Sequence, residues 1–307
     1  MKIAVIGAGA MGGLFAARLA ECGRDVALVE VAPAMIESIA SRGLRMSGVF
    51  GQKAYDLPIR QADGYDDIFD LLIVFTKGMH TASAIAAAAH TIGPRTMALT
   101  VQNGIGNVEA IAKFIPRERI AMGITNWPST LVEPGLIDVA GKGEVRLWSA
   151  CGDASDDIVS ICSMIDAAGL RCRLDRDVEV AIWEKLAFNA ALNSLSAVTG
   201  LTVGEMGDRP ESRAVVFEIV DEVVAIAKAK GLAVDRERVR HAVEHAFANH
   251  RQHKPSMLQD RLAGRSMEIG TITGAASLCA DEVAVDAPVT ATFARLLTLL
   301  DGRAFGG

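Results

Sequence analysis

Apolar and polar positions along the first half of the chain predict short buried strands that alternate with amphipathic helices. Apolar runs predict strands at 2–6, 25–30, 71–75 and 97–101, and helical spacing predicts helices over 11–22, 34–42, 82–92 and 108–114. Strands and helices that alternate through short connections are typical of a parallel sheet covered on both faces. The first half therefore predicts a doubly wound, mostly parallel α/β domain.

The pattern changes near residue 141. Two more strands are expected at 143–148 and 170–174, with a helix over 158–168 between them. Beyond residue 175 every periodic segment is helical, and helices are expected over 178–198, 214–230, 237–248, 267–281 and 286–300. We therefore expect an α/β domain over residues 1–174 and an all-α domain over residues 175–307.

Composition narrows the class of protein. Half of the residues are apolar and 22% are charged, which predicts a packed core. The net charge of −6 gives no basic footprint for nucleic acid, and no apolar run reaches the ~18 residues of a membrane span. Five scattered cysteines without a Cys-x-x-Cys pair fit reduced thiols. We expect a cytoplasmic protein with neither a nucleic-acid nor a membrane partner.

A glycine-rich turn follows the first predicted strand. The sequence Gly7-Ala8-Gly9-Ala10-Met11-Gly12 fits G-x-G-x-x-G, between a strand and a helix as the motif requires. Gly7 permits the tight turn, Gly9 leaves room for a pyrophosphate, and Gly12 lets helix and strand approach closely. Ala10 and Met11 begin the helix, whose free N–H groups favour phosphate. The alternative is an ordinary surface turn rich in glycine; the context favours a Rossmann dinucleotide site.

Glu30 ends the second predicted strand, about twenty residues beyond the glycine turn. A carboxylate at this place can accept hydrogen bonds from ribose hydroxyls and would repel a 2′-phosphate. The next residues, Val31-Ala32-Pro33, supply no compensating Lys or Arg. The sequence therefore predicts NAD(H) in preference to NADP(H), unless Glu30 is only a surface charge.

A polar stripe runs along the otherwise apolar helix expected over 178–198. Lys185, Asn189 and Asn193 recur every four residues and so share one side of the helix. One interpretation is a solvent-exposed face. The other is a catalytic lysine that protonates a ketone oxygen, with two asparagines that hold the substrate.

Other candidates lie at strand ends and in the helical half. Asn103 and Lys77 each follow a strand, where a doubly wound sheet binds its ligand, although an ordinary Asn-Gly turn also explains Asn103. Glu268 could bind a substrate hydroxyl or tune Lys185, or be a solvated surface charge. Three glycines in a helical pattern suggest close approach to a helix or ligand: Gly264, Gly270 and Gly274.

The segment His241-Ala242-Val243-Glu244-His245 matches the H-x-x-E-H zinc motif. No third ligand is evident and arginines flank the segment, as on a solvated face. We therefore expect no metal site.

Together these motifs resemble the ketopantoate reductase (2-dehydropantoate 2-reductase) family over nearly the whole chain. The likeness rests on the glycine turn, Thr76-Lys77, Asn103-Gly104, the Trp183-x-Lys185-Leu186-Ala187-x-Asn189-x-x-x-Asn193 helix, Ser256-Met257-Leu258-Gln259-Asp260 and Glu268-Ile269. It implies an enzyme of pantothenate biosynthesis that passes hydride from NAD(P)H to the C2 ketone of a 2-keto acid. The family fold, a Rossmann domain joined to an all-helical domain with the active site in the cleft, agrees with the segmentation.

The resemblance also implies roles for individual residues. Lys185 would be the general acid, and Glu268 would contact the substrate region. The cofactor would meet Lys77 and Asn103, and the substrate would be held by Asn103, Asn189, Asn193 and Ser256.

The chain departs from the family pattern at several positions. Glu30 stands where the family usually has a basic residue suited to NADPH, and His253 and Gly270 stand where Asn and Asp are common. The alternatives are an NAD-dependent 2-hydroxyacid dehydrogenase of the same family that acts on another acid, or a dinucleotide-binding sensor without turnover. A homodimer is compatible with the long helical domain.

Overall fold

The computed structural model describes residues 1–302, which form two compact units. Unit 1 contains residues 1–102 and 107–178, and unit 2 contains residues 103–106 together with the chain from Glu179 onward. Among the described residues, no helix is both long and apolar enough to cross a lipid bilayer.

Unit 1 is built on an eight-stranded sheet in the order β12-β11-β8-β7-β6-β1-β2-β5. The strands are β1 Lys2–Ile6, β2 Asp25–Val29, β5 Ile59–Arg60, β6 Phe69–Val74, β7 Ile92–Thr100, β8 Ile120–Thr125, β11 Val145–Ser149 and β12 Cys172–Leu174. Six neighbouring strands run parallel to one another, in the order β8, β7, β6, β1, β2 and β5. Strand β11 is antiparallel to β8, and β12 is parallel to β11. The predicted doubly wound, mostly parallel sheet is confirmed.

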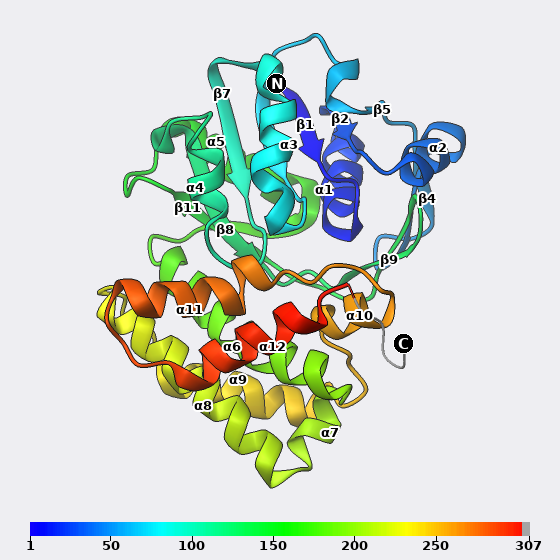
Figure 1. Cartoon of the computed structure of the whole chain (residues 1–307). Helices are drawn as coiled ribbons and strands as arrows, with labels where there is room; N and C mark the ends of the chain where they lie inside the picture. The colour runs from blue at the N-terminus through cyan, green and yellow to red at the C-terminus, as the bar shows by residue number, and fades with distance from the viewer. Residues whose placement is uncertain (303–307) are drawn as a thin grey trace. The chain divides into compact units, whose positions relative to one another are not determined.

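Both faces of this sheet are buried. Ile3 and Val5 of β1 point into one core cluster, and Ala4 and Ile6 point into another. The helices of unit 1 are α1 Ala10–Glu21, α2 Pro33–Arg42, α3 Thr81–Ala87, α4 Asn107–Ile111 and α5 Asp156–Ile165. Helices α1 and α5 cover the first face, and α3 and α4 cover the second (Figure 1). Strands buried on both sides are continuous apolar runs, which explains why the sequence predicted them.

A second sheet of four strands was missed by the sequence pattern. Its order is β4-β3-β10-β9, with bounds β3 Leu44–Gly48, β4 Lys53–Tyr55, β9 Ser129–Glu133 and β10 Leu136–Val139. Leu44 and Ile137 pack against α1 at Gly13. Strands β4 and β9 are short and mostly exposed, so they lack the apolar run that marks a buried strand.

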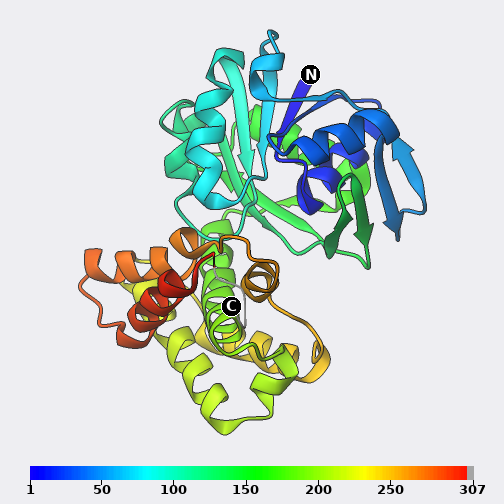
Figure 2. The ribbon, with the colours of Figure 1, turned by 45° about the vertical axis from the view of Figure 1, so that its right-hand side comes forward.

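Unit 2 is helical, and its described part contains no strand, as the sequence predicted. Its helices are α6 Val178–Thr199, α7 Val203–Gly207, α8 Pro210–Ala229, α9 Arg236–Asn249, α10 Ser256–Leu262, α11 Thr273–Glu282 and α12 Pro288–Leu300. The other helices pack around α6, which is green in Figure 2. Leu186, Ala187, Ala190 and Ala191 of α6 are at most 1% exposed. Helix α6 is therefore the centre of the helical core.

The single helix expected over 267–281 is wrong at its start. Residues Ile269–Thr271 form a 3₁₀ turn, η6, and the backbone of Ile272 then leaves helical geometry before α11 begins. Close approach was expected at three glycines but occurs only at Gly274, where a Cβ would lie 2.9 Å from a backbone oxygen. Gly264 lies in a turn with positive φ, and neither it nor Gly270 has a neighbour within 4 Å of the Cβ position.

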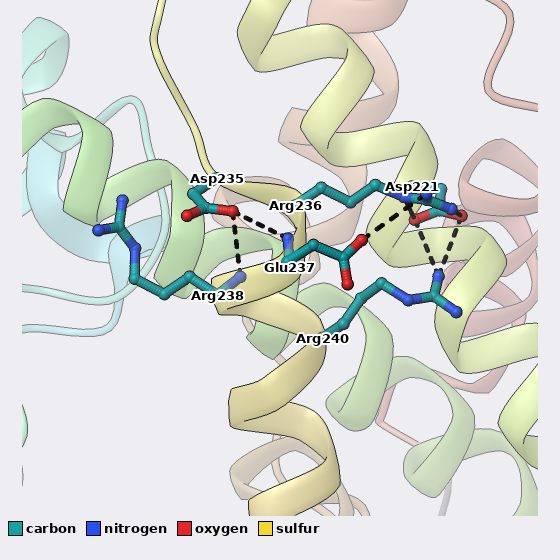
Figure 3. Close-up of polar contacts among 6 residues, drawn as sticks. All are labelled: Asp221, Asp235, Arg236, Glu237, Arg238 and Arg240. Atoms are coloured by element: carbon teal, nitrogen blue, oxygen red, sulfur yellow. Dashed lines mark hydrogen bonds and ion pairs between the residues drawn. The ribbon is translucent and has the colours of Figure 1, made fainter.

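Charged side chains tie the start of α9 to α8 (Figure 3) and to α6. Asp235 caps α9 by accepting the backbone N–H groups of residues 237 and 238. Asp221 of α8 accepts Arg236 in a two-pronged pair and also Arg240. On the other side, Glu184 of α6 accepts the Asp235 amide at 3.1 Å and pairs with Arg238. Exposed pairs contribute only about 1 kcal/mol or less each, so the network mainly orients α9 beside α6.

Candidate functional site

The glycine turn between β1 and α1 has the geometry that the motif predicts. Gly7 has φ +99°, and a Cβ there would lie 2.9 Å from the backbone of Phe75. A Cβ on Gly12 would lie 1.8 Å from the Gly7 carbonyl oxygen, so only glycine fits at this contact. Gly9, the N-cap of α1, has no neighbour within 4 Å of its Cβ position. Ala10 and Met11 form the first turn of α1, whose N–H groups face this open space.

Glu30 is bonded to the glycine turn itself. Its Oε2 accepts the Ala8 backbone N–H at 2.8 Å, and its Oε1 accepts the N–H groups of Val31 and Ala32 at 2.8 and 3.0 Å. The carboxylate is therefore held at the end of β2 beside the turn by three backbone donors. Sequence reasoning assigned Glu30 to a ribose but did not foresee these bonds, since none follows from periodicity.

The ends of β6 and β7 are joined by a residue to which the sequence analysis gave no role. Gln102 Nε2 donates to the Thr76 carbonyl oxygen at 2.6 Å and to Thr81 Oγ1 at 2.9 Å, and its Oε1 accepts the Thr100 hydroxyl at 2.9 Å. Gln102 thereby fixes the turn that carries Lys77, which is partly buried. The sequence placed Gln102 directly after a predicted strand, but it could not show which distant residues the Gln102 side chain would bond.

The Lys185, Asn189 and Asn193 stripe is not a solvent face. Lys185 and Asn189 are only partly exposed and Asn193 is 4% exposed. Asn189 makes no hydrogen bond to any described residue, so its amide is open to a ligand. The stripe is therefore not a fully exposed solvent face, because the apolar positions of α6 lie in the helical core.

Burial changes the acidity of Lys185. Loss of hydration lowers the pKa of its ammonium to about 8, and the negative charge of Glu268 acts in the opposite direction by raising it. The structure thus brings Glu268 within electrostatic range of Lys185, although 83 positions separate them in sequence. A lysine with a pKa near neutrality can exchange a proton under ordinary conditions.

Asn193 and Ser256 contact each other. Asn193 Oδ1 accepts the Ser256 hydroxyl and the Met257 backbone N–H, each at 3.1 Å, and so caps the start of α10. At the other end of α10, Arg261 donates to the carbonyl oxygens of Ala197 and Val198 at the end of α6. Helix α10 is therefore fastened to α6 at both ends, which accounts structurally for the Ser-Met-Leu-Gln-Asp segment.

Asn103 falls in unit 2, not in the unit whose strand precedes it. The predicted site residues consequently form two groups. Unit 1 holds the turn residues 7, 9, 10, 11 and 12 with Glu30 and Lys77, and unit 2 holds Lys185, Glu268, Asn103, Asn189, Asn193 and Ser256.

The H-x-x-E-H segment lies on α9 and has other partners. Glu244 pairs with Arg213, and the ring of His245 lies 5.6 Å from that of His250. Residues 1–302 contain no group of three or more His, Cys, Asp or Glu side chains placed to hold a metal ion.

A Rossmann-type sheet with a glycine turn, followed by a helical unit with a partly buried lysine, defines a class of two-unit oxidoreductases. Residues 3–150 match the family described as "Ketopantoate reductase PanE/ApbA", and residues 177–301 match "Ketopantoate reductase PanE/ApbA C terminal". The chain belongs to the ketopantoate reductase family and is an oxidoreductase that acts on a CH–OH group.

Individual relatives cover nearly the whole chain. The 2-dehydropantoate 2-reductase of Streptococcus pyogenes serotype M1 is 29% identical over 301 residues, which are 98% of this chain and 96% of the relative. The structure of 2-dehydropantoate 2-reductase from Geobacter metallireducens GS-15 is 31% identical with a TM-score of 0.91, and covers 97% of this chain and 99% of its own. D-Mandelate dehydrogenase with NADH and anilino(oxo)acetate is 29% identical with a TM-score of 0.92, at 98% coverage of both chains.

The two glycines of the turn are expected to respond differently to substitution. Gly12→Ala should lower the free energy of unfolding by about 3 kcal/mol or more, because its Cβ would overlap the Gly7 carbonyl oxygen. Gly9→Ala should change it by less than about 1 kcal/mol, since its Cβ meets open space. Urea denaturation of both variants measures the difference, and equal losses would contradict the geometry.

Proposed function

We propose that this protein reduces the C2 ketone of a 2-keto acid, with hydride from a nicotinamide dinucleotide and a proton from Lys185. The observation that carries the proposal is the place of Lys185 on α6, partly buried in the helical core, where burial lowers its pKa to about 8 and Glu268 acts to raise it. Membership of the ketopantoate reductase family makes 2-dehydropantoate the first substrate to consider.

The glycine turn fits the dinucleotide. The open space at Gly9 and the N–H groups that begin α1 suit a pyrophosphate. When bound, the reduced cofactor supplies hydride to the keto carbon. Lys77, partly buried in the turn after β6, is proposed to contact the cofactor from its own strand end.

Lys185 completes the reduction. Its ammonium donates a proton to the ketone oxygen as negative charge develops there, and is left as the neutral amine. Asn189, with an open amide, and Asn103 are proposed to hold the acid. Asn193 retains its Nδ2 donors for the substrate, because its Oδ1 is occupied by Ser256 and Met257. Glu268 keeps Lys185 charged at neutral pH by raising its pKa.

NADH is proposed in preference to NADPH. Three backbone donors hold the Glu30 carboxylate at the end of β2, where it can accept the ribose hydroxyls and would repel a 2′-phosphate. The family resemblance implies NADP, and Glu30 is the residue on which the proposed preference for NAD depends.

A second candidate keeps the chemistry and changes the acid. An NAD-dependent 2-hydroxyacid dehydrogenase is favoured by Glu30 and by the likeness to D-mandelate dehydrogenase, which was solved with NADH. The two candidates differ in the substrate's side chain, not in the role of Lys185.

A panel of 2-keto acids assayed with NADH and NADPH in parallel tests the proposal. We expect loss of reduced-cofactor absorbance with at least one acid and a higher kcat/KM with NADH. Greater turnover of ketopantoate supports the first candidate, and greater turnover of an aromatic 2-keto acid supports the second. A higher kcat/KM with NADPH would contradict the Glu30 argument, and no turnover with any acid would favour a dinucleotide-binding sensor.

Removal of the proposed general acid should affect rate and not cofactor binding. Lys185→Ala is expected to lower kcat by about 10²–10⁴, with the Kd for NADH nearly unchanged because the glycine turn lies in unit 1. Lys228→Ala, which removes an exposed lysine of α8, is the matched control. Unchanged turnover of Lys185→Ala would refute the assigned role.

The pH dependence should follow the ionisation of Lys185. Reduction needs the ammonium, so its kcat/KM should fall as pH rises through about 8, while oxidation of the hydroxy acid needs the amine and should rise. Glu268→Gln removes the charge that raises the pKa of Lys185, so both midpoints should move to lower pH. Glu218→Gln, at an exposed position of α8, should leave them in place. Midpoints that stay or rise in Glu268→Gln would show that Lys185 is not the titrating group.

A further inference from the structure

Four residues between β7 and α4 leave unit 1 and pack with unit 2. Gln102 ends the first part of unit 1, Asn107 resumes it, and residues 103–106 group with the helices. The Ile105 backbone N–H donates to the Thr271 carbonyl oxygen at 2.9 Å, and the Ile105 side chain packs against the helical core. The segment is therefore attached to unit 2 by a backbone bond and by apolar contact.

Gly104 makes this attachment possible. Its φ is +82°, and a Cβ there would lie 2.0 Å from the Thr271 carbonyl oxygen and 2.7 Å from the carbonyl carbon. No side chain fits between these two backbones, because neither is a flexible group that could move aside. The position requires glycine because its φ is positive and because no side chain fits against Thr271.

Thr271 ends η6, the turn that begins directly after Glu268. The Ile272 amide donates back to the Glu268 carbonyl oxygen at 3.2 Å and closes the turn. Asn103, one residue before Gly104, is thus fastened to the turn that carries Glu268, the carboxylate that acts on Lys185. Two site residues distant in sequence, Asn103 and Glu268, therefore share one support.

We infer that Gly104, Ile105 and Thr271 form a clasp that positions Asn103 relative to Glu268 and Lys185, so that Gly104 and Thr271 are positioning residues for the reaction. The inference rests on the proposed function, in which Asn103 meets cofactor and substrate. A bond of this kind contributes only about 1 kcal/mol to stability, whereas a displacement of about 1 Å at a reacting group can cost about 10² in rate. Displacement of Asn103 should therefore be detected in the kinetics of variants that remain folded.

Gly104→Ala tests the clasp, with Gly106→Ala as its matched control. Gly106 has φ +89° but no atom within 4 Å of its Cβ position, so both variants share the backbone strain and only Gly104→Ala adds the overlap. We expect Gly104→Ala to lower kcat with the best 2-keto acid at least about tenfold relative to Gly106→Ala, with a smaller change in KM for NADH. Equal kinetics in the two variants would overturn the inference.

Two further measurements separate positioning from general damage. Hydrogen exchange at the Ile105 amide should become faster in Gly104→Ala and stay slow in Gly106→Ala. The Cβ overlap should also lower the thermal unfolding temperature of Gly104→Ala, so kinetics are compared at a temperature where both variants are folded. In an Asn103→Ala background, Gly104→Ala should lower kcat less than about twofold further, because its effect acts through Asn103. Additive losses would show that the clasp does not act through Asn103.

The outcomes for the clasp and for the proposed function are distinct. If the wild-type protein turns over no 2-keto acid, the proposed function fails, whatever the exchange rate at Ile105. If the wild type is active and Gly104→Ala matches Gly106→Ala, the clasp alone fails.

Discussion

The chemistry proposed for the helical unit depends on one ammonium group, that of Lys185, on an otherwise apolar helix. Dehydration of Lys185 favours its neutral form, and the carboxylate of Glu268 favours its charged form. Neither effect exists without the other helices, because α6 loses its water only when they surround it. The chemistry proposed for this protein is therefore a consequence of how α6 is packed.

The elements around α6 are held by side chains that bond to backbone groups. Asn193 caps the start of α10, and Arg261 donates hydrogen bonds to the last carbonyl groups of α6. Glu184 receives the amide that begins α9. Such bonds satisfy the free backbone groups at helix ends and also fix the neighbouring helices along α6. Glu184, the residue before the reactive lysine, thus helps to fix α9 against α6.

In unit 1 the corresponding constraint is the contact between Gly12 and the Gly7 carbonyl oxygen. It sets how closely α1 approaches β1. The Ala8 N–H bond to Glu30 joins the turn to the end of β2, and the Val31 and Ala32 N–H groups hold the same carboxylate. Gln102, which follows β7, likewise donates a hydrogen bond to the Thr76 carbonyl oxygen after β6 and so connects these two strand ends. The strand ends are therefore connected by side chains, while the strands themselves are connected by the sheet.

The sequence by itself determined the parallel sheet, the helical second half, the glycine turn and the Lys185 stripe. Each is encoded locally, by an apolar run, a helical period or a fixed spacing between residues. The exposed sheet of β4, β3, β10 and β9 and the break at Ile272 were not predictable, since short exposed strands and a single non-helical residue leave no periodic signal.

Only the tertiary structure decided which residues act on one another. It placed Glu268 near Lys185, paired Asn193 with Ser256, and bonded Ile105, two residues after Asn103, to Thr271 in the helical unit. It also decided that the polar stripe of α6 is partly buried and not a fully exposed face. The physical reason is that burial and electrostatic coupling depend on distances through space, which residues far apart in the chain acquire only when the core closes around them.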